Sequence, residues 1–422
     1  MTSIVMPGVN LAEALRPHGR RLVVIGDSQS ALSSPAIHDA KRWWVWALAI
    51  DGWRYDLAGL SAAAGRSTAA MVANFAEVTA LIDAGGPIDE AWICAGSNDV
   101  ANADTAIAGI AAFDTLTQLC RDAGIARIRA LSVLPRPAAA MSADVQRGMI
   151  VYNRGLADRS RRGEIELIDA GAAIRDLDAA DGSALSGMLA DLVHPNALGA
   201  LRIGSSVAAA IAGAAAPLDD FAAIGADTYA LHPGLSRQLL DNPLLAGSGG
   251  TNDGGASGTL PTGWHVGYPG AAIAGAVAAS TDALPRQRRW QQVTFSGNLS
   301  ALSYFGVLIQ WVFSVDSKGI GAGTALRARL SVRAAGLSAN FKDLPFQLWF
   351  FDAAYGILST AACLAETGTG AGELPASLTL EIPKAVVPVN CKHIAFRLDA
   401  SFAAGACAGT IAVSEPQLSI LN

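Results

Sequence analysis

Residues 22–30 read LVVIGDSQS, and this stretch decides how the first half of the chain folds. Its first four residues are apolar and mostly β-branched, which predicts a short buried strand that ends at Gly26. Ser28 then lies at the carboxyl end of that strand, the edge where open α/β sheets keep their sites. A serine at that position can act as a nucleophile, which requires a base within hydrogen-bond reach.

Further strand-like runs follow, each separated from the next by a stretch long enough for a helix. The predicted strands are 22–25, 88–94, 128–133 and 165–168. The predicted helices are 36–50, 67–83, 104–123, 143–162 and 196–214. This alternation is typical of a parallel sheet covered by helices on both faces, so the first half is predicted to be α/β.

Two other polar motifs are expected at the same edge of this sheet. The predicted strand 88–94 runs into Gly-Ser-Asn-Asp, which brings the Asn98 amide to a strand end as a candidate oxyanion donor. Asp191 and His194 precede the last predicted helix, and their three-residue spacing lets one turn present both side chains. A serine, a histidine and a carboxylate are the parts of a nucleophilic triad.

Taken in this order, the motifs resemble those of the SGNH hydrolases, also called GDSL-type esterases and lipases, over roughly residues 21–214. The matching positions are Gly26, Asp27 and Ser28, then Gly96, Asn98 and Asp99, and finally Asp191, His194 and Pro195. The resemblance implies a flavodoxin-like three-layer fold with a parallel sheet. It also implies a serine hydrolase that acts on ester bonds without a metal or an organic cofactor.

The same resemblance implies the role of each site residue. Ser28 would attack the ester carbonyl, His194 would accept and return its proton, and Asp191 would orient the imidazole. The oxyanion would lie among the backbone N–H groups of Ser28 and Gly65 and the side-chain amide of Asn98.

The sequence departs from the family pattern at two places. Gly65 matches the glycine of the second block, but the asparagine that usually neighbours it is absent. Gln29 replaces the leucine of the GDSL name, and we interpret this change as one that concerns substrate rather than catalysis. Asp27 and Asp99 are expected to hold loops by accepting hydrogen bonds from backbone N–H groups.

The second half of the chain has a different sequence pattern, with short strand-like runs and almost no helical periodicity. We expect the α/β domain to span 1–216, a connecting segment 217–250 and an all-β domain 251–422. Short alternating runs separated by turn residues predict a jelly roll or another β-sandwich. The predicted strands are 291–295, 304–315, 325–334, 346–351, 377–382, 393–398 and 409–420.

This second domain is similar to the carbohydrate-binding modules appended to hydrolases and phage tail proteins. Exposed aromatic rings would stack on sugars, and the candidates are Trp264, Tyr268, Trp311, Trp349 and Tyr355. Asn252 and Asp253 are candidate ligands of a calcium ion, and the simpler interpretation is that they belong to a Gly-rich loop. In the first half, Trp43 and Trp46 are expected in the core, whereas Trp44 is expected to lie elsewhere.

Composition excludes several classes of protein. Of 422 residues, 51% are hydrophobic and 16% charged, which excludes a disordered chain. A net charge of −6 without a large basic cluster argues against nucleic acid as a partner. The sequence contains neither a continuous apolar run of about 20 residues nor a recognisable Sec signal peptide. The five cysteines lack CxxC spacing, so neither a disulfide framework nor a cysteine zinc site is expected.

Together these features predict a serine esterase that removes O-acetyl or other short acyl groups from a carbohydrate polymer. One alternative is a general short-chain esterase or thioesterase that acts on small esters. Another is a phage or prophage tail component that binds surface glycan. The location is expected to be cytoplasmic or virion-associated, and the oligomeric state stays open.

Overall fold

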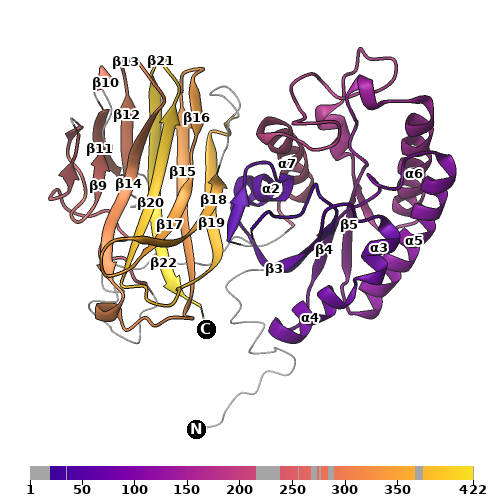
Figure 1. Cartoon of the computed structure of the whole chain (residues 1–422), viewed down its shortest axis with the longest axis horizontal. Helices are drawn as coiled ribbons and strands as arrows, with labels where there is room; N and C mark the ends of the chain where they lie inside the picture. Colours follow the sequence, from indigo (N-terminus) through magenta and orange to yellow (C-terminus); the bar gives the residue numbers. More distant parts are fainter. Residues whose placement is uncertain are drawn as a thin grey trace, which may run out of the picture.

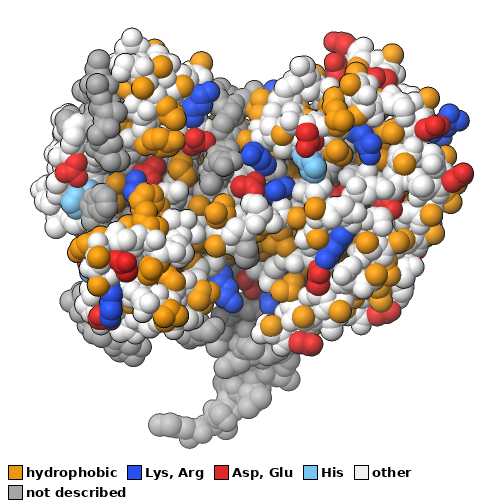
Figure 2. All heavy atoms as spheres, viewed as in Figure 1, with side chains coloured by type: hydrophobic (Ala, Val, Ile, Leu, Met, Phe, Trp, Pro, Cys, Tyr) orange, Lys and Arg blue, Asp and Glu red, His pale blue; other side chains and the backbone are white. Residues whose placement is uncertain are grey.

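The computed structural model describes residues 20–34, 36–214, 238–254, 256–267, 273–274, 277–283, 289–365 and 374–421. Figure 1 shows an α/β half, drawn in indigo to magenta, beside a β-sandwich drawn in orange to yellow. On the face seen in Figure 2, Lys and Arg side chains alternate with Asp and Glu without a large patch of one sign. Among the described helices, none combines the length and the apolar character that crossing a membrane requires.

The α/β half is built on a five-stranded parallel sheet in the order β3-β1-β4-β5-β6. Its strands are β1 (Arg20–Gly26), β3 (Tyr55–Ala62), β4 (Glu90–Cys94), β5 (Arg127–Leu131) and β6 (Glu166–Ile168). Counted within this sheet alone, the order is the flavodoxin-like 2-1-3-4-5. The strand order reverses between β1 and β4, and such a switch point is where open α/β sheets bind ligands.

Helices cover both faces of this sheet, as the sequence predicted (Figure 1). They are α2 (Trp43–Asp51), α3 (Thr68–Ala73), α4 (Ala76–Gly85), α5 (Ala103–Asp122), α6 (Ala143–Arg161) and α7 (Ala197–Ile211). Because side chains alternate along a strand, Val23 and Ile25 of β1 join the core under α3 to α6. Leu22 and Val24 join the core that contains α2 and α7.

The predicted helix 36–50 is wrong in its first part. Residues Ile37–Asp39 form strand β2, and the helix begins only at Trp43. The strand exists because it pairs with β18 of the sandwich, a tertiary contact that overrides local preference. The sequence also missed β3, whose residues are half-buried because it lies at the edge of its sheet. The predicted helix 67–83 is divided into α3 and α4.

The second half is all-β, as predicted. Its strands are β7 (Thr251–Asn252), β8 (Ser257–Gly258), β9 (His265–Gly267), β10 (Ile273–Ala274), β11 (Val277–Ala283), β12 (Arg289–Phe295), β13 (Asn298–Leu299), β14 (Ser303–Ser314), β15 (Ala325–Ala335), β16 (Phe341–Asp343), β17 (Phe346–Phe351), β18 (Ile357–Ala365), β19 (Ser377–Val386), β20 (His393–Phe402), β21 (Gly405–Ala406) and β22 (Gly409–Ile420). Among the longer strands, the sequence missed β11 and β18.

Two large sheets face each other in this half. One has the order β19-β15-β22-β12-β11-β8, and the other has the order β2-β18-β17-β20-β14-β9-β7. Aromatic rings fill the space between them: Phe295, Phe305 and Phe402 have ring centroids 5.0 to 5.7 Å apart. Such edge-to-face and tilted arrangements are the ones that aromatic pairs prefer.

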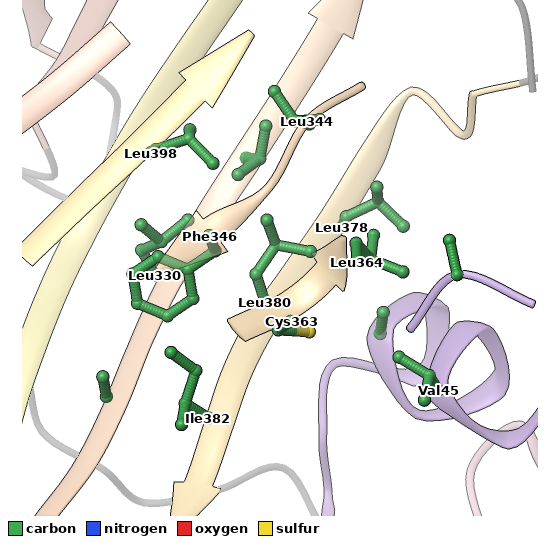
Figure 3. Close-up of a cluster of buried hydrophobic side chains, with 14 of the residues drawn as sticks. Val45, Leu330, Leu344, Phe346, Cys363, Leu364, Leu378, Leu380, Ile382 and Leu398 are labelled. Atoms are coloured by element: carbon green, nitrogen blue, oxygen red, sulfur yellow. The ribbon is translucent and has the colours of Figure 1, made fainter. Parts of the chain in front are cut away.

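The two halves share one hydrophobic core. Strand β2 runs parallel to β18, and the Ala362 N–H donates to Ala36 O at 3.0 Å. Figure 3 shows Val45 of α2 in the same cluster of buried side chains as Leu364 and Leu378 of the sandwich. The predicted boundary near residue 216 lies outside the described residues, but β2 and α2 already join the halves at residues 37–51.

All five cysteines are among the described residues, and each is buried and unpaired. Burial raises the pKa of each thiol.

Candidate active site

The turn after β1 presents Ser28 at the switch point of the sheet. The N–H groups of Ser30 and Ala31 donate to Asp27 O at 3.1 and 3.0 Å, which closes the turn. The Asp27 carboxylate accepts from the Gln29 N–H at 2.9 Å. Burial raises the pKa of Asp27, although the Gln29 N–H opposes this rise. The buried Asp27 side chain therefore stabilises the turn that carries Ser28.

Asp191, His194 and Ser28 form a continuous chain of hydrogen bonds. Asp191 Oδ2 lies 2.7 Å from His194 Nδ1, and His194 Nε2 lies 2.7 Å from Ser28 Oγ. Because a carboxylate can only accept, the ring carries its proton on Nδ1 and turns the Nε2 lone pair toward the serine hydroxyl. This is the arrangement in which a histidine takes a proton from serine.

The backbone around Asp191 fixes this geometry. Asp191 Oδ1 accepts from the N–H groups of Val193 and His194, both at 2.8 Å. Partial burial works against ionisation, but the backbone and ring hydrogen bonds of His194 lower the pKa of Asp191 to about 2. The carboxylate is thus ionised at neutral pH. The Asn196 side chain, which accepts from the Gly199 N–H at 2.9 Å, begins helix α7 directly after this loop.

Gly65 and Asn98 lie on neighbouring loops that are tied together. Asn98 Nδ2 donates to Arg66 O at 2.9 Å, one residue after Gly65. A primary amide has two N–H groups, so the second stays available to an oxyanion. Gly65 has φ +74°, a left-handed conformation that favours glycine, and no atom lies within 4 Å of the place a Cβ would take.

Asp99 makes only internal contacts. Its carboxylate accepts from the Thr68 N–H at 3.0 Å and from Thr68 Oγ1 at 2.8 Å. Thr68 Oγ1 in turn lies 2.8 Å from the Tyr152 hydroxyl. Burial raises the pKa of Asp99 against these hydrogen bonds. Asp99 thereby anchors the start of α3 to the loop that carries Asn98.

Gln29 has a different place from the one the sequence suggested. Its side chain is buried, its Nε2 donates to Val193 O at 3.1 Å, and its Oε1 lies 3.5 Å from Cys94 Sγ. Gln29 thus links the serine turn to the histidine loop and to the end of β4. The interpretation that this residue concerns substrate is wrong, because the side chain faces the protein interior.

Arg42 is a contributor that the sequence motifs did not reveal. Its Nη1 donates to Ser28 O at 2.8 Å, and its Nε donates to Asp39 Oδ2 at 3.3 Å. Asp39 is the last residue of β2, so a strand of the sandwich sheet holds the arginine that contacts Ser28. No motif signals this contact, because it depends on the pairing of β2 with β18.

The tryptophans of α2 support the same turn. Trp43 Nε1 donates to Ser30 Oγ at 3.2 Å, and Trp44 Nε1 donates to Ser30 O at 2.9 Å. Trp43, Trp44, Trp46 and Trp53 are all fully buried. The prediction of a core role for Trp43 and Trp46 is confirmed, whereas the expected separate position of Trp44 is wrong.

The aromatic candidates of the sandwich have different exposures. Trp264 is fully buried, and Trp349 is half-buried under the Arg397 guanidinium. The Tyr355 side chain is 60% exposed, and its ring stacks on His393 with centroids 4.6 Å apart. Tyr268 and the side chain of Trp311 lie outside the described part of the chain.

The calcium reading of Asn252 and Asp253 finds no support in the described residues. Asn252 Nδ2 donates to Gly258 O at 2.8 Å, and Asp253 Oδ2 lies 3.5 Å from His265 Nδ1. Within the described ranges, no three His, Cys, Asp or Glu side chains gather as a metal site.

The chain matches no family model and no curated protein. Solved structures align with slightly less than half of it. A GDSL-like lipase from Bacteroides thetaiotaomicron is 17% identical over 48% of this chain and 93% of its own, with a TM-score of 0.35. A lipase/acylhydrolase from Enterococcus faecalis is 15% identical over 47% and 98%, with a TM-score of 0.34.

A third structure is a variant of an acetyl-xylooligosaccharide esterase from Geobacillus. It is 18% identical over 45% of this chain and 92% of its own, with a TM-score of 0.35. The chemistry of the site follows from its own atoms.

Proposed function

We propose that this protein is an SGNH-type serine esterase. One observation carries the proposal: the two 2.7 Å hydrogen bonds that join Asp191, His194 and Ser28. A serine hydroxyl is a weak nucleophile unless an adjacent base removes its proton, and His194 Nε2 is in place to do so. Asp191 keeps the proton on Nδ1 and stabilises the imidazolium that forms.

The reaction would proceed in two halves. In the first, Ser28 Oγ bonds to the ester carbonyl carbon while its proton passes to His194 Nε2. The bond to the leaving alcohol then breaks as His194 returns that proton to the alcohol oxygen, which leaves an acyl ester on Ser28. In the second, water loses a proton to His194 and attacks this ester. The acid leaves, and the proton returns to Ser28 Oγ.

The oxyanion of each tetrahedral intermediate would lie among the Ser28 N–H, the Gly65 N–H and the free N–H of Asn98. These donors are held before the reaction begins: Asn98 by Arg66 O, and Gly65 by a turn that only glycine adopts easily. Donors fixed in advance cost no reorganisation in the transition state, which is why their loss slows such reactions strongly.

For the substrate, we propose short acyl esters, O-acetyl groups above all, on a carbohydrate polymer. The side chains of His194 and Asp191 are 37% and 54% exposed, so the triad lies at an open surface that a large substrate can approach. The sandwich also presents the exposed ring of Tyr355, and an exposed tyrosine offers an apolar face for a sugar.

Ester hydrolysis by matched variants tests this function. We expect wild type to hydrolyse p-nitrophenyl acetate faster than the octanoate and to release acetate from acetylated xylan or an acetylated bacterial polysaccharide. Ser28→Ala should lose all of these activities. Ser33→Ala, which changes an exposed serine of the same loop, should keep them.

Two results would contradict the proposal in different ways. Equal activity of Ser28→Ala and wild type would remove the serine mechanism. Hydrolysis of small esters without acetate release from any polymer would leave a general short-chain esterase, the alternative that the sequence raised.

A further inference from the structure

A cavity of about 510 Å³ lies between the α/β half and the sandwich, apart from the triad. Its lining residues are Arg21, Leu32, His38, Asp56, Leu57, Ala58, Gly59, Leu60, Ala62, Arg327, Glu381, Pro383, Lys384 and Leu421. The cavity therefore exists only because the two halves are docked. Ligand pockets commonly have this size and occur preferentially at domain interfaces.

Two edge strands form the long walls of the cavity. β3 ends the five-stranded sheet, and β19 ends the six-stranded sheet of the sandwich (Figure 1). At a rise of roughly 3.3 Å per residue, the stretch from Asp56 to Ala62 extends for about 20 Å. The wall is thus long enough for an extended ligand.

One end of the cavity reaches the catalytic edge of the sheet. Ala62 pairs in register with Gly26, which precedes Ser28 by two residues. Leu32, on the other side of the serine turn, lines the cavity as well. A chain that lies along β3 therefore leads toward the nucleophile.

The cavity wall contains both cationic and anionic side chains. Arg327 and Glu381 are 8% and 1% exposed and form a bidentate ion pair with two N···O distances of 2.9 Å. Arg21 Nε lies 3.5 Å from Asp56 Oδ2 near the other end. Because these charges are paired, the wall offers donors and acceptors without a large net charge.

His38 adds a polar group whose partner is missing among the described residues. The residue is 6% exposed, and its Nδ1 is buried with no hydrogen-bond partner in the described chain. Its ring lies between Trp53 and Trp44, with centroid distances of 6.2 and 5.2 Å. Burial lowers the pKa of His38 to about 4, opposed by Glu381, so the ring is neutral at pH 7. A neutral imidazole can both donate and accept.

We infer that this cavity is a carbohydrate subsite, which holds a neutral, hydroxyl-rich segment of the polymer while an acyl group of the same polymer reaches Ser28. The inference rests on the proposed function and names where its substrate binds. Hydroxyl groups match a wall of paired charges and a neutral imidazole, and Leu57, Leu60 and Pro383 provide apolar surface for sugar C–H groups.

An acyl chain is a poorer occupant. It would desolvate the exposed Lys384 ammonium at the cavity wall without replacing its hydrogen bonds to water, and burying unsatisfied polar groups is costly. An anionic ligand would meet Glu381 and Asp56 as well as the cations. The cavity therefore selects for a polar but uncharged ligand.

The test fills the cavity and compares two substrates. In Leu60→Trp an indole would occupy the cavity, whereas Leu358→Trp makes the same change at a partly exposed leucine of β18 outside the lining. We expect the ratio of kcat/KM for acetylated polymer to kcat/KM for p-nitrophenyl acetate to fall at least tenfold in Leu60→Trp. The ratio should stay within twofold of wild type in Leu358→Trp.

A second variant tests the cavity without a change to the hydrophobic core, in case Leu60→Trp misfolds. Lys384 is exposed at the mouth of the cavity, so Lys384→Glu leaves the core unchanged. It should lower the same ratio about threefold to tenfold, mainly through KM, with an unchanged unfolding midpoint. If neither variant changes the ratio, or if Leu60→Trp slows the octanoate ester as strongly as the polymer, the inference is wrong.

Binding without turnover separates this inference from the esterase proposal. Ser28→Ala protein is applied to a glycan array, with and without Leu60→Trp. We expect the double variant to lose at least tenfold in affinity for whichever glycans Ser28→Ala binds. If wild type hydrolyses no ester but glycan binding still depends on Leu60, the esterase proposal is wrong and the inferred subsite stands. Absence of glycan binding, or binding that Leu60→Trp leaves unchanged, would overturn the subsite.

Discussion

Asn98 carries two tasks on one side-chain amide. One N–H donates to Arg66 O, which aligns the Asn98 loop with the Gly65 loop. The other N–H is the proposed donor to the oxyanion. An exchange of the amide for a carboxylate keeps the size of the side chain and removes both donors. The residue therefore offers a sharp test of the oxyanion assignment.

We expect Asn98→Asp and Asn98→Ala to lower kcat for p-nitrophenyl acetate by on the order of 10²- to 10³-fold, with KM nearly unchanged. Asn74→Ala removes an exposed amide that only contacts its own helix, and it should retain wild-type kcat. Steady-state kinetics on the three variants, with unfolding midpoints measured beside them, decides the matter. A rise in KM at constant kcat would place Asn98 in substrate binding instead.

At this scale the sequence located the main groups well. Ser28 follows a strand whose periodicity is plain, and the Asp191–His194 spacing fits one turn. The contacts of Gln29 and Arg42 could not be predicted, because Gln29 joins segments far apart in the chain and the place of Arg42 depends on the pairing of β2 with β18. Gln29 meets Val193, which is 164 residues away, and only the folded sheet brings the two together.

Among the elements, β2 and α2 determine how the serine turn is held. β2 ends at Asp39, which pairs with Arg42, and Arg42 donates to Ser28 O. The first tryptophans of α2 then donate to Ser30. Because β2 is a strand of the sandwich sheet, the second half of the chain takes part in positioning Ser28.

We predict that Arg42→Ala lowers kcat for p-nitrophenyl acetate roughly tenfold, which corresponds to the loss of one charge-assisted hydrogen bond of about 1.5 kcal/mol. KM should change less than twofold, since Arg42 acts through Ser28. Arg42→Lys should restore part of kcat, and Arg147→Ala, at an exposed arginine of α6, should have no effect. A change in stability alone, with kcat retained, would show that Arg42 only supports the fold.

The longer elements were predictable from the sequence, and the short ones were not. Helices α5 and α6 have strong periodicity and N-terminal caps at Asn102 and Ser142, so their bounds were found within one residue or so. β2 has three residues and no pattern of its own. β3 is half-exposed and contains Gly59, so its alternation is weak.

For the whole molecule, the buried His38 makes the joined halves sensitive to acid. Its pKa is lowered by burial from about 6.5 to about 4, so at pH 5 the unfolded chain binds a proton that the folded chain excludes. Stability from this residue is therefore present above pH 6.5 and is lost as the pH falls toward 4. The full loss is roughly 3 kcal/mol at 1.4 kcal/mol per pH unit.

Urea unfolding between pH 7.5 and 4.5 checks this expectation. The free energy of unfolding should fall more steeply with decreasing pH in wild type than in His38→Phe, which has no group to titrate at that place. The carboxylates and the other histidines titrate in both proteins, so their contributions to the free energy of unfolding cancel in the difference between the two. Parallel curves for the two proteins would show that His38 accepts its proton without opposition from the fold.

The pairing of β2 with β18 bears on how this protein could have been assembled or could be re-engineered. A polypeptide that stops after α7 would carry the whole triad, yet it would expose the free edge of β2 and the apolar side of α2, including Val45. The border between the two units in space therefore does not coincide with a single border in the amino-acid sequence. An exchange of sandwiches between homologues would have to transfer residues 36–53 together with the C-terminal half, because otherwise the α/β half would receive a partner that does not fit the loop of Ser28.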